Sequence, residues 1–322
     1  MSLAPRSFPP PTVFPHPSSN FDQQMEAKSV TQPQATMLDR YIGFIAGVCS
    51  GATKLAVGHP FDTIKVRMQT EGGFGRFKGP LDCLVETVKK EGFRGLYKGA
   101  TPPLLGWALM DSVQMGSLTN FRLLLQGGDR NKRLTVPEHA LAGFGAGLVV
   151  SFVATPVELL KGKLQVQYDA KTKVYSGPID CARQLIRDNG IRGLWKGLAP
   201  CMLFRSFFWV LWGSYEVYVT ELKKYKVHDR LVPFFAGGLA ATTFWCVSFP
   251  FDVVKTRIMT QPEVKPLRYP STAACFRYIL RTEGIKGFYR GFLPCFLRSF
   301  PTNAAAIFVF DNVMKAGHSF SQ

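Results

Sequence analysis

Long apolar stretches alternate with short charged connections along most of the chain. Six of these stretches reach the ~20 residues that a helix needs to cross a bilayer. None is uniformly apolar, so the polar positions inside them require a cavity, a partner or water. The pattern predicts an all-α membrane protein with six transmembrane helices, at roughly 39–69, 102–126, 137–166, 199–224, 230–259 and 293–317.

The first 38 residues differ from the rest of the chain. They hold seven prolines, few aliphatic residues and little net charge. Such a composition predicts a disordered tail, 1–38. Neither a secretory apolar region nor an arginine-rich amphipathic transit peptide is recognisable there, so targeting information is expected in the body of the protein.

One sequence unit occurs three times. HPFDTIKVRMQ at Pro60 returns as TPVELLKGKLQ at Pro156 and as FPFDVVKTRIM at Pro250, with spacings of 96 and 94 residues. A glycine-aromatic-basic box follows each copy, and it reads EGFRGLYKG at 91–99, NGIRGLWKG at 189–197 and EGIKGFYRG at 283–291. Cysteine keeps the same register, at positions 83, 181 and 275. These markers predict tandem repeats with pseudo-threefold symmetry, over 39–128, 129–226 and 227–318.

Each repeat is expected to hold two long helices joined by a charged connection, in which a stretch such as PLDCLVETVKKEG forms a short amphipathic helix. Proline removes one intrahelical hydrogen bond, so the first, third and fifth spans should kink at Pro60, Pro156 and Pro250. Glycines at four-residue steps, namely Gly43, Gly47 and Gly51 and then Gly143 and Gly147, should let helices approach closely.

An acid stands two residues after each of these prolines, and a base stands five residues after it. Acid and base three apart share one helix face, but their repetition in three helices favours pairing between helices. Three helix ends around one axis would then close a ring of ion pairs. The six residues are Asp62, Lys65, Glu158, Lys161, Asp252 and Lys255.

Composition narrows the function. Hydrophobic residues make up 46%, charged residues 19%, and the formal net charge is +17. Because Lys and Arg are spread along the chain beside apolar segments, the charge indicates anionic lipid rather than nucleic acid as a partner. Seven cysteines without a C-x-x-C pair argue for reduced thiols. No phosphate-binding loop, zinc-protease motif or nucleophile elbow is present, so neither an enzyme nor a cofactor or metal is expected.

The repeated proline, acid and base followed by the glycine-aromatic-basic box resemble the mitochondrial carrier family over about 39–318. The resemblance implies a monomeric, multi-pass transporter of the inner mitochondrial membrane that works by alternating access, with an anionic lipid such as cardiolipin as a further partner. It also implies that the ring closes the cavity on the matrix side through three pairs, Asp62 with Lys161, Glu158 with Lys255 and Asp252 with Lys65.

The family's gate on the intermembrane-space side is matched only in fragments. Arg122 supplies the base of the first repeat without the aromatic residue and acid, whereas Glu216 and Asp311 supply acids without a base. With one base among the three positions, at most one bridge of this second ring is expected to form.

Charges in mid-span are candidates for substrate binding. Arg298, in FLRSFPTNAA, matches the contact position of the sixth helix and resembles the carnitine, acylcarnitine and basic amino acid carriers. Its guanidinium suits a carboxylate, because it binds one with two hydrogen bonds. In the fourth helix the register is ambiguous between Phe204 and Arg205. Asp111 is expected to pair either with a substrate ammonium or with one of the two arginines.

Weaker candidates complete the predicted substrate site. Gln114, one turn beyond Asp111, is a polar neighbour of the cavity, and Trp107 would cover a quaternary ammonium unless it only packs. His59 would hydrogen-bond a substrate near the kink unless it is structural. The leading interpretation is a carrier of a small zwitterion or cation with a carboxylate, either a basic amino acid or carnitine and its esters. The alternatives are a receptor or structural protein without transport, and a carrier of another class of metabolite.

Overall fold

The structure is a computed structural model that describes residues 37–71, 77–127, 134–167, 174–225, 227–228, 231–264 and 266–319. The described residues form helices and no strand, which confirms the predicted all-α class. All but the last two residues of the predicted tail lie outside the described part. Residues 50–309 form one compact unit, and the described residues up to Cys49 and from Phe310 onward form a second.

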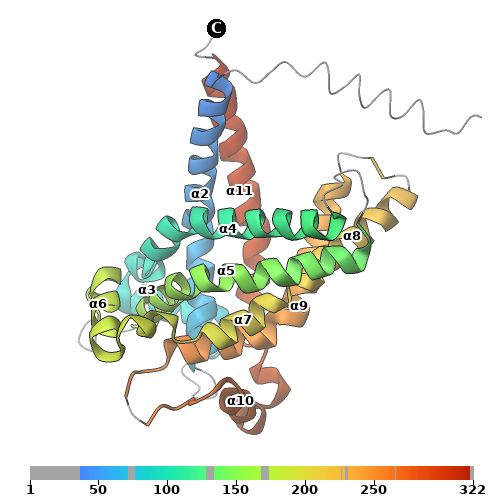
Figure 1. Ribbon diagram of the computed structural model, residues 1–322. Helices are drawn as coiled ribbons and strands as arrows, with labels where there is room; N and C mark the ends of the chain where they lie inside the picture. Colours follow the sequence, from blue (N-terminus) through green and yellow to red (C-terminus); the bar gives the residue numbers. More distant parts are fainter. Residues whose placement is uncertain are drawn as a thin grey trace, which may run out of the picture. The chain divides into compact units, whose positions relative to one another are not determined.

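The long helices, which are drawn in Figure 1, follow the predicted spans closely. In the larger unit α4 and α5 run side by side (Figure 1). Short helices connect the long ones: α3 (Pro80–Glu91), η2 (Phe93–Tyr97), α6 (Pro178–Asn189), η3 (Ile191–Trp195) and α10 (Thr272–Gly287). The long segments are α2 (Met37–Glu71), α4 (Thr101–Gln126), α5 (Val136–Gln165), α7 (Leu198–Ser206), α8 (Phe208–Lys224), α9 (Val232–Thr260) and α11 (Phe292–Ser319).

The fourth predicted span is divided between α7 and α8. Phe207 separates the two helices, and its backbone N–H donates to the carbonyl of Phe204 at 3.3 Å. The break packs against α5, where a Cβ on Gly147 would lie 2.1 Å from the carbonyl oxygen of Arg205 and one on Gly143 would lie 2.8 Å from that of Phe208. These two glycines therefore permit the close approach that their spacing predicts.

The glycines of α2 behave differently. Among the described residues, apart from the backbone of α2 itself, nothing lies within 4 Å of a Cβ placed on Gly47 or on Gly51, so the close approach expected for these two stays a prediction. In the smaller unit a different glycine has this role. A Cβ on Gly317 of α11 would lie 2.4 Å from Cγ2 of Ile42 of α2.

Three helices of the described part are long and apolar enough by themselves to cross a membrane: α5, α9 and α11. The other predicted spans carry more polar residues for a physical reason. In α2, for example, His59, Asp62 and Arg67 are buried inside the protein, where they contact other polar groups rather than lipid. A hydropathy criterion counts such residues as if lipid surrounded them.

The short helices begin with the same signals in the first two repeats. Pro80 and Pro178 occupy first-turn positions, where a missing N–H costs nothing. The carboxylate of Asp82 accepts a hydrogen bond from the backbone N–H of Lys78, and Asp180 accepts one from Ser176. Both carboxylates also lie near the positive end of their helix dipole.

The cysteines in register mark three equivalent cores. Cys83, Cys181 and Cys275 are each 0% exposed, and each belongs to a separate apolar cluster below its long helix. All seven cysteines are free thiols in the structure. Their register therefore reflects packing between the short helix and the long helix of each repeat.

Candidate functional site

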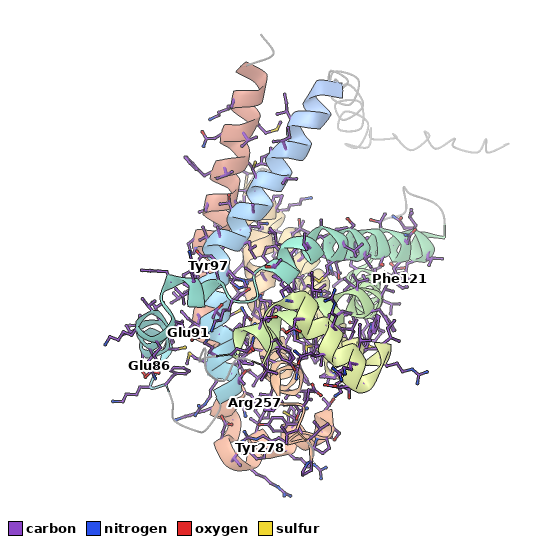
Figure 2. All side chains as sticks on the ribbon, turned by 90° about the vertical axis from the view of Figure 1, so that its left-hand side faces the viewer. Glu86, Glu91, Tyr97, Phe121, Arg257 and Tyr278 are labelled. Carbon is purple, nitrogen blue, oxygen red and sulfur yellow. The ribbon has the colours of Figure 1, made fainter. Side chains whose placement is uncertain are left out.

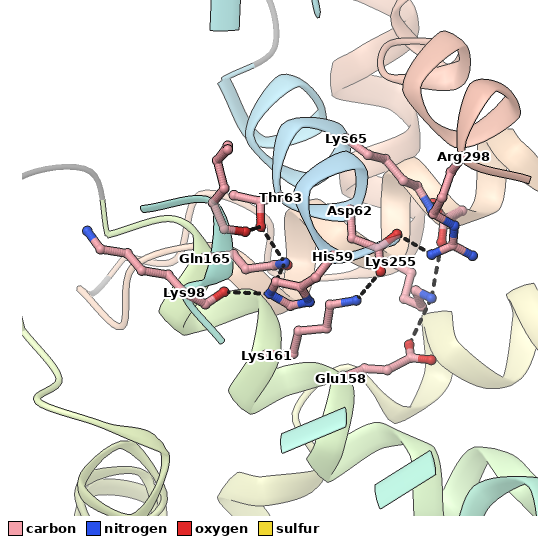
Figure 3. A network of polar contacts seen from close by, with 12 residues as sticks. His59, Asp62, Thr63, Lys65, Lys98, Glu158, Lys161, Gln165, Lys255 and Arg298 are labelled. Carbon is pink, nitrogen blue, oxygen red and sulfur yellow. Dashed lines mark hydrogen bonds and ion pairs between the residues drawn. The ribbon is translucent and has the colours of Figure 1, made fainter. Parts of the chain in front are cut away.

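The acids and bases of the repeated motif form a closed ring, which is called the ion-pair ring below. Lys65 Nζ lies 2.7 Å from Asp252. Figure 3 shows the other two pairs, in which Lys161 Nζ lies 2.6 Å from Asp62 and Lys255 Nζ lies 2.8 Å from Glu158. These are the three pairs that the resemblance implies. Asp252 is the best covered, since its side chain is 4% exposed. Each pair joins two different long helices, so the ring holds α2, α5 and α9 together.

The three pairs differ in their additional partners. Gln69 Nε2 donates to Asp252 at 2.9 Å, and Lys255 also lies 3.1 Å from Asp252. The residue nine positions after proline is again glutamine in α5, but Gln165 donates to the hydroxyl of Thr63 instead, at 3.1 Å. In α9 this position holds Met259, which has no amide to donate.

Two arginines contact the remaining acids of the ring. Arg298 of α11 forms an ion pair with Asp62, and Arg205 Nη2 of α7 lies 2.5 Å from Glu158 (Figure 3 shows the first). Both residues are predicted substrate contacts. In this conformation their guanidinium groups therefore bind the ring's own carboxylates, on the two pairs that lack a glutamine donor.

A cavity of about 330 Å³ is lined in part by the residues of the ring. Six of the seven predicted substrate residues line it: Trp107, Asp111, Gln114, Phe204, Arg205 and Arg298. Both candidates of the ambiguous register in the fourth span are thus present. Among the described residues, Asp111 has no base within ion-pair distance, and Gln114 Oε1 accepts no hydrogen bond. Their polar groups are free to contact a ligand.

The opposite end of the helices holds a looser group, called the Arg122 cluster. The Arg122 guanidinium lies 4.9 Å from the ring centroid of Trp212, and His139 Nδ1 lies 3.7 Å from Glu216. No ion pair of Arg122 occurs among the described residues, and the side chain of Asp311 is outside that part. The upper limit of one bridge that the sequence sets for this end therefore stays a prediction.

Beyond the ring, α2 and α9 each bind an acid of their own repeat. Arg67 lies 2.6 Å and Lys98 lies 2.5 Å from Glu91. Arg257 lies 2.5 Å and Arg290 lies 3.1 Å from Glu283. Figure 2 labels Glu91 and Arg257, one from each of these base–acid–base clusters. Burial opposes ionisation of Glu91, but hydrogen bonds from Arg67 and Lys98 lower its pKa, so it is a carboxylate at neutral pH.

The comparisons with known proteins agree with this geometry. The sequence profile of the family described as "Mitochondrial carrier protein" matches residues 38–129, 132–226 and 229–319. Together these segments cover most of the chain. The chain belongs to the mitochondrial carrier family.

Named relatives extend over nearly the same region. Mitochondrial substrate carrier family protein L of Dictyostelium discoideum is 44% identical over 84% of this carrier and 94% of the relative. A carnitine/acylcarnitine carrier-like protein of Arabidopsis thaliana is 36% identical over 85% and 98%. The mitochondrial basic amino acids transporter of Rattus norvegicus is 35% identical over 82% and 86%. Other relatives are named as a magnesium exporter and a glutamate/glycine carrier, so the family does not specify the substrate.

Aromatic residues that the sequence analysis missed line one wall of the carrier's cavity. Phe208, Phe244 and Trp245 lie there beside Phe204. Lys65 Nζ is 4.6 Å from the centroid of Trp245, and Lys255 Nζ is 4.1 Å from that of Phe204. These cation–π contacts hold two ring lysines from the cavity side. No pattern in the sequence distinguishes them, because aromatic residues in an apolar helix also face lipid.

His59 does not line the cavity. Its ring stacks on Tyr97 at a centroid distance of 6.2 Å, and Nε2 donates to the carbonyl of Lys98 at 2.9 Å. These contacts give His59 a structural role, because they join α2 to the glycine-aromatic-basic box of the same repeat. Substrate binding by His59 stays a prediction.

The box glycines allow successive repeats to touch, a role that sequence reasoning did not assign. Gly99 has a φ of 74° and Gly291 has a φ of 80°, both in the left-handed region. A Cβ on Gly99 would lie 2.8 Å from the carbonyl oxygen of Lys161, and one on Gly291 would lie 2.9 Å from that of Lys65. Any side chain would therefore separate the box from the next ring helix.

Proposed function

We propose that this carrier moves a small zwitterion or cation bearing a carboxylate across the inner mitochondrial membrane by alternating access. A basic amino acid, or carnitine and its esters, fits this description. We further propose that the ion-pair ring faces the matrix, that the protein acts as a monomer, and that an anionic lipid such as cardiolipin binds it. The conformation described above is then the one closed toward the matrix.

The observation that carries the proposal is the free carboxylate of Asp111 in the same cavity as Arg205 and Arg298. Both arginines already have carboxylate partners, whereas Asp111 has none among the described residues. A lone carboxylate in a cavity at membrane depth is costly unless a cation joins it. A substrate with an ammonium group would supply that cation, and its carboxylate would compete for an arginine.

The charges of the cavity lining also limit the substrate class. The lining contains five cations, from Lys65, Lys161, Lys255, Arg205 and Arg298, and four carboxylates, three of which belong to the ring. The excess is one positive charge. This balance disfavours a bare divalent cation, and Asp111 would repel the phosphates of a nucleotide or the extra carboxylates of citrate.

Substrate binding and opening of the ring share the same arginines. A substrate carboxylate that takes the guanidinium of Arg298 removes one partner from Asp62, and one that takes Arg205 does the same to Glu158. Each loss removes one of the two cations that hold a ring carboxylate in place. A ligand that binds the opening state more tightly than the closed one shifts the equilibrium toward opening. The carboxylate is therefore expected to be necessary for transport as well as for binding.

The test is uptake by the carrier reconstituted in liposomes. We expect labelled arginine, ornithine or carnitine to enter and unlabelled lysine to compete, whereas ATP, citrate and phosphate stay inert. Asp111→Asn keeps the size of the side chain and removes its charge. It should weaken the binding of cationic substrates by ~2 to 4 kcal/mol, the cost of stripping one partner from a charge pair that the bound substrate buries. Asp188→Asn, the same change on α6 outside the cavity lining, is the matched control.

Strong competition by ATP or citrate would contradict the assignment of the cavity charges, as would unchanged selectivity in Asp111→Asn. A receptor or structural protein would give no uptake of any solute, although correctly inserted. The complete ion-pair ring argues against that alternative, because a protein without transport has no need for a gate.

A further inference from the structure

The second repeat lacks an acid that the other two repeats have. The residue before the first box glycine is Glu91 in the first repeat and Glu283 in the third, where each binds two bases. In the second repeat this residue is Asn189. Its amide cannot neutralise Lys163 and Lys196, which stand at the positions of the two bases.

Asn189 nevertheless occupies the equivalent place in the fold. A Cβ built on the next box glycine would lie 2.6 Å from Cβ of Glu91 in the first repeat and 2.6 Å from Cβ of Glu283 in the third. In the second repeat the corresponding distance, from Gly193 to Cβ of Asn189, is 3.0 Å. The backbone is therefore repeated, and only the charge is missing.

Glu263 contacts the two bases that Asn189 leaves unneutralised. Its Oε1 lies 2.6 Å from Lys163 Nζ, and its Oε2 forms an ion pair with Lys196. The side chain of Lys163 is 4% exposed, so this contact replaces most of its water. Burial opposes ionisation of Glu263, but hydrogen bonds from Lys163 and Lys196 lower its pKa below the usual range.

Glu263 comes from a different repeat than the bases it binds. It lies in the segment after α9, thirteen residues beyond Pro250, and so belongs to the third repeat. Two hydrogen bonds hold the start of this segment in place. The side chain of Gln261 accepts one from the backbone N–H of Tyr269 at 2.9 Å and donates one to the carbonyl of Tyr269 at 3.2 Å. Lys163 also donates to the carbonyl of Gln261 at 2.6 Å.

The first and third repeats also make a backbone contact with their neighbours. Arg67 Nε donates to the carbonyl of Gln165 at 3.1 Å, and Arg257 Nε donates to that of Gln69 at 2.8 Å. Glu91 and Glu283 each bind two bases of their own repeat. At the boundary between the second and third repeats, the acid of the base–acid–base cluster comes from the other side of the boundary.

We propose that Glu263 is the acid of the second repeat's base–acid–base cluster and that, because it belongs to the third repeat, it latches these two repeats together while the carrier is closed toward the matrix. The latch rests on the alternating access proposed above. The long helix and the short helix of the second repeat must then release Glu263 before they part from α9.

Thermal unfolding of the purified carrier tests the first half of this proposal. Glu263→Gln should lower Tm by about 2 to 4 °C, as the loss of one partly buried ion pair does in a chain of this size class. Adding Asn189→Glu should restore most of that loss, because the acid returns to the place it has in the other repeats. Glu283→Gln is the matched control: it should lower Tm similarly, and Asn189→Glu should not rescue it.

Cysteine labelling from the matrix side tests the latch itself. Thr260 is a suitable reporter, since it is 4% exposed and its Cγ2 lies 3.0 Å from a Cβ placed on Gly162 of the second repeat. Without substrate, Thr260→Cys should be labelled about tenfold faster in Glu263→Gln than in the parent, equivalent to ~1.4 kcal/mol. The double variant with Asn189→Glu should stay fast, because its restored acid does not cross the boundary.

An unchanged Tm in Glu263→Gln, or a failure of Asn189→Glu to restore it, would overturn the assignment of Glu263 as the missing acid. Labelling of the double variant at the parent's rate would overturn the latch. Neither measurement uses a substrate, so both are independent of whether basic amino acids or carnitine prove to be carried.

Discussion

The two ends of the cavity differ in how tightly they join neighbouring repeats. At one end the ion-pair ring connects three helices through pairs of 2.6 to 2.8 Å, and Gln69, Arg205 and Arg298 add further hydrogen bonds. At the other end, the described part of the Arg122 cluster offers one cation–π contact at 4.9 Å and one contact of 3.7 Å between His139 and Glu216. In this conformation the ring end is thus closed by ion pairs, whereas the other end, where the sequence supplies one base at three positions, is held by weaker contacts.

Burial explains why this difference has energetic weight. The carboxylate of Asp252 is 4% exposed, so its attraction to Lys65 is little screened by water. Glu216 is 26% exposed and His139 is charged only when protonated. Closing the weaker end therefore releases less free energy. Without substrate, the carrier is expected to spend most of its time open toward the intermembrane space.

The largest effect should come from reversing one charge of the ring. Asp252→Lys places a cation beside both Lys65 and Lys255, and it should nearly abolish transport, because an uncompensated buried charge costs ~3 to 5 kcal/mol. Adding Lys65→Asp restores attraction across the two helices and should recover a measurable part of the initial uptake rate in liposomes. Recovery stays incomplete because Lys255, 3.1 Å from Asp252 in the parent, still faces the new lysine.

The control for this pair is the reciprocal single variant, Lys65→Asp, which should be as inactive as Asp252→Lys. Protein insertion is checked in each case by protease protection of the liposomes. If the double variant were inserted but no more active than either single one, the pairing of these two residues would not be the reason for their effect.

A smaller effect should separate the two ends directly. Lys161→Gln removes one ring cation without adding a charge, and we expect matrix-side labelling of Thr260→Cys to rise by about 30-fold, for a loss of ~2 kcal/mol. Arg122→Gln removes the corresponding cation at the weaker end. It should change labelling at Thr119→Cys, at the other entrance, by at most about fivefold, since we expect this half-buried cation–π contact to give ~1 kcal/mol.

Both labelling experiments need a background without reactive native thiols. Replacing Cys49 and Cys246 is sufficient as a starting point, because the other five cysteines are buried. The same background without the reporter gives the correction for any thiol that opening exposes. Equal responses to Lys161→Gln and Arg122→Gln would mean that the two ends close with similar strength.

The ring and the architecture are the parts that the sequence predicts well. The period of Pro60, Pro156 and Pro250 places acids and bases at equivalent positions, and pairing between helices then follows from charge. What fails is the identification of each residue's partner. The sequence predicts that Arg298 and Arg205 bind a substrate. An unpaired guanidinium at membrane depth is costly, however, and without substrate the two arginines pair with the nearest carboxylates, which belong to the ring.

The remaining failures have related causes. Trp245 and Phe244 were missed because an aromatic residue in a long apolar helix looks the same whether it faces a cavity or lipid. The helix break at Phe207 could not be predicted, because no proline or glycine stands at that position. The break depends on contacts with α5, where Gly143 and Gly147 allow the backbone around Phe207 to approach closely. Glu263 lies in a polar segment after α9, where nothing in the local sequence indicates that its partners belong to another repeat.

An effect smaller than that of Lys161→Gln concerns the one ring acid that has an amide donor. Gln69→Met introduces at α2 the residue that stands at the same position of α9, Met259, and it changes the volume of the side chain little. It removes the 2.9 Å hydrogen bond to Asp252 while leaving Lys65 in place. A hydrogen bond to a charged group contributes ~1.5 kcal/mol at the lower end of its range. Matrix-side labelling of Thr260→Cys should therefore rise about tenfold, less than in Lys161→Gln.

Gln165→Met is the matched control for this variant, because Gln165 has the same position in α5 but donates to Thr63 and not to a ring acid. If Gln69 acts through the ion pair, Gln69→Met weakens that pair and lowers the free-energy barrier to opening toward the matrix. Where this opening limits exchange, Gln69→Met should therefore raise the transport rate and Gln165→Met should not. If both variants behave alike, the effect is one of helix packing near the buried Thr63 and Gln69, and the strength of the ring would rest on its lysines, Arg205 and Arg298 alone.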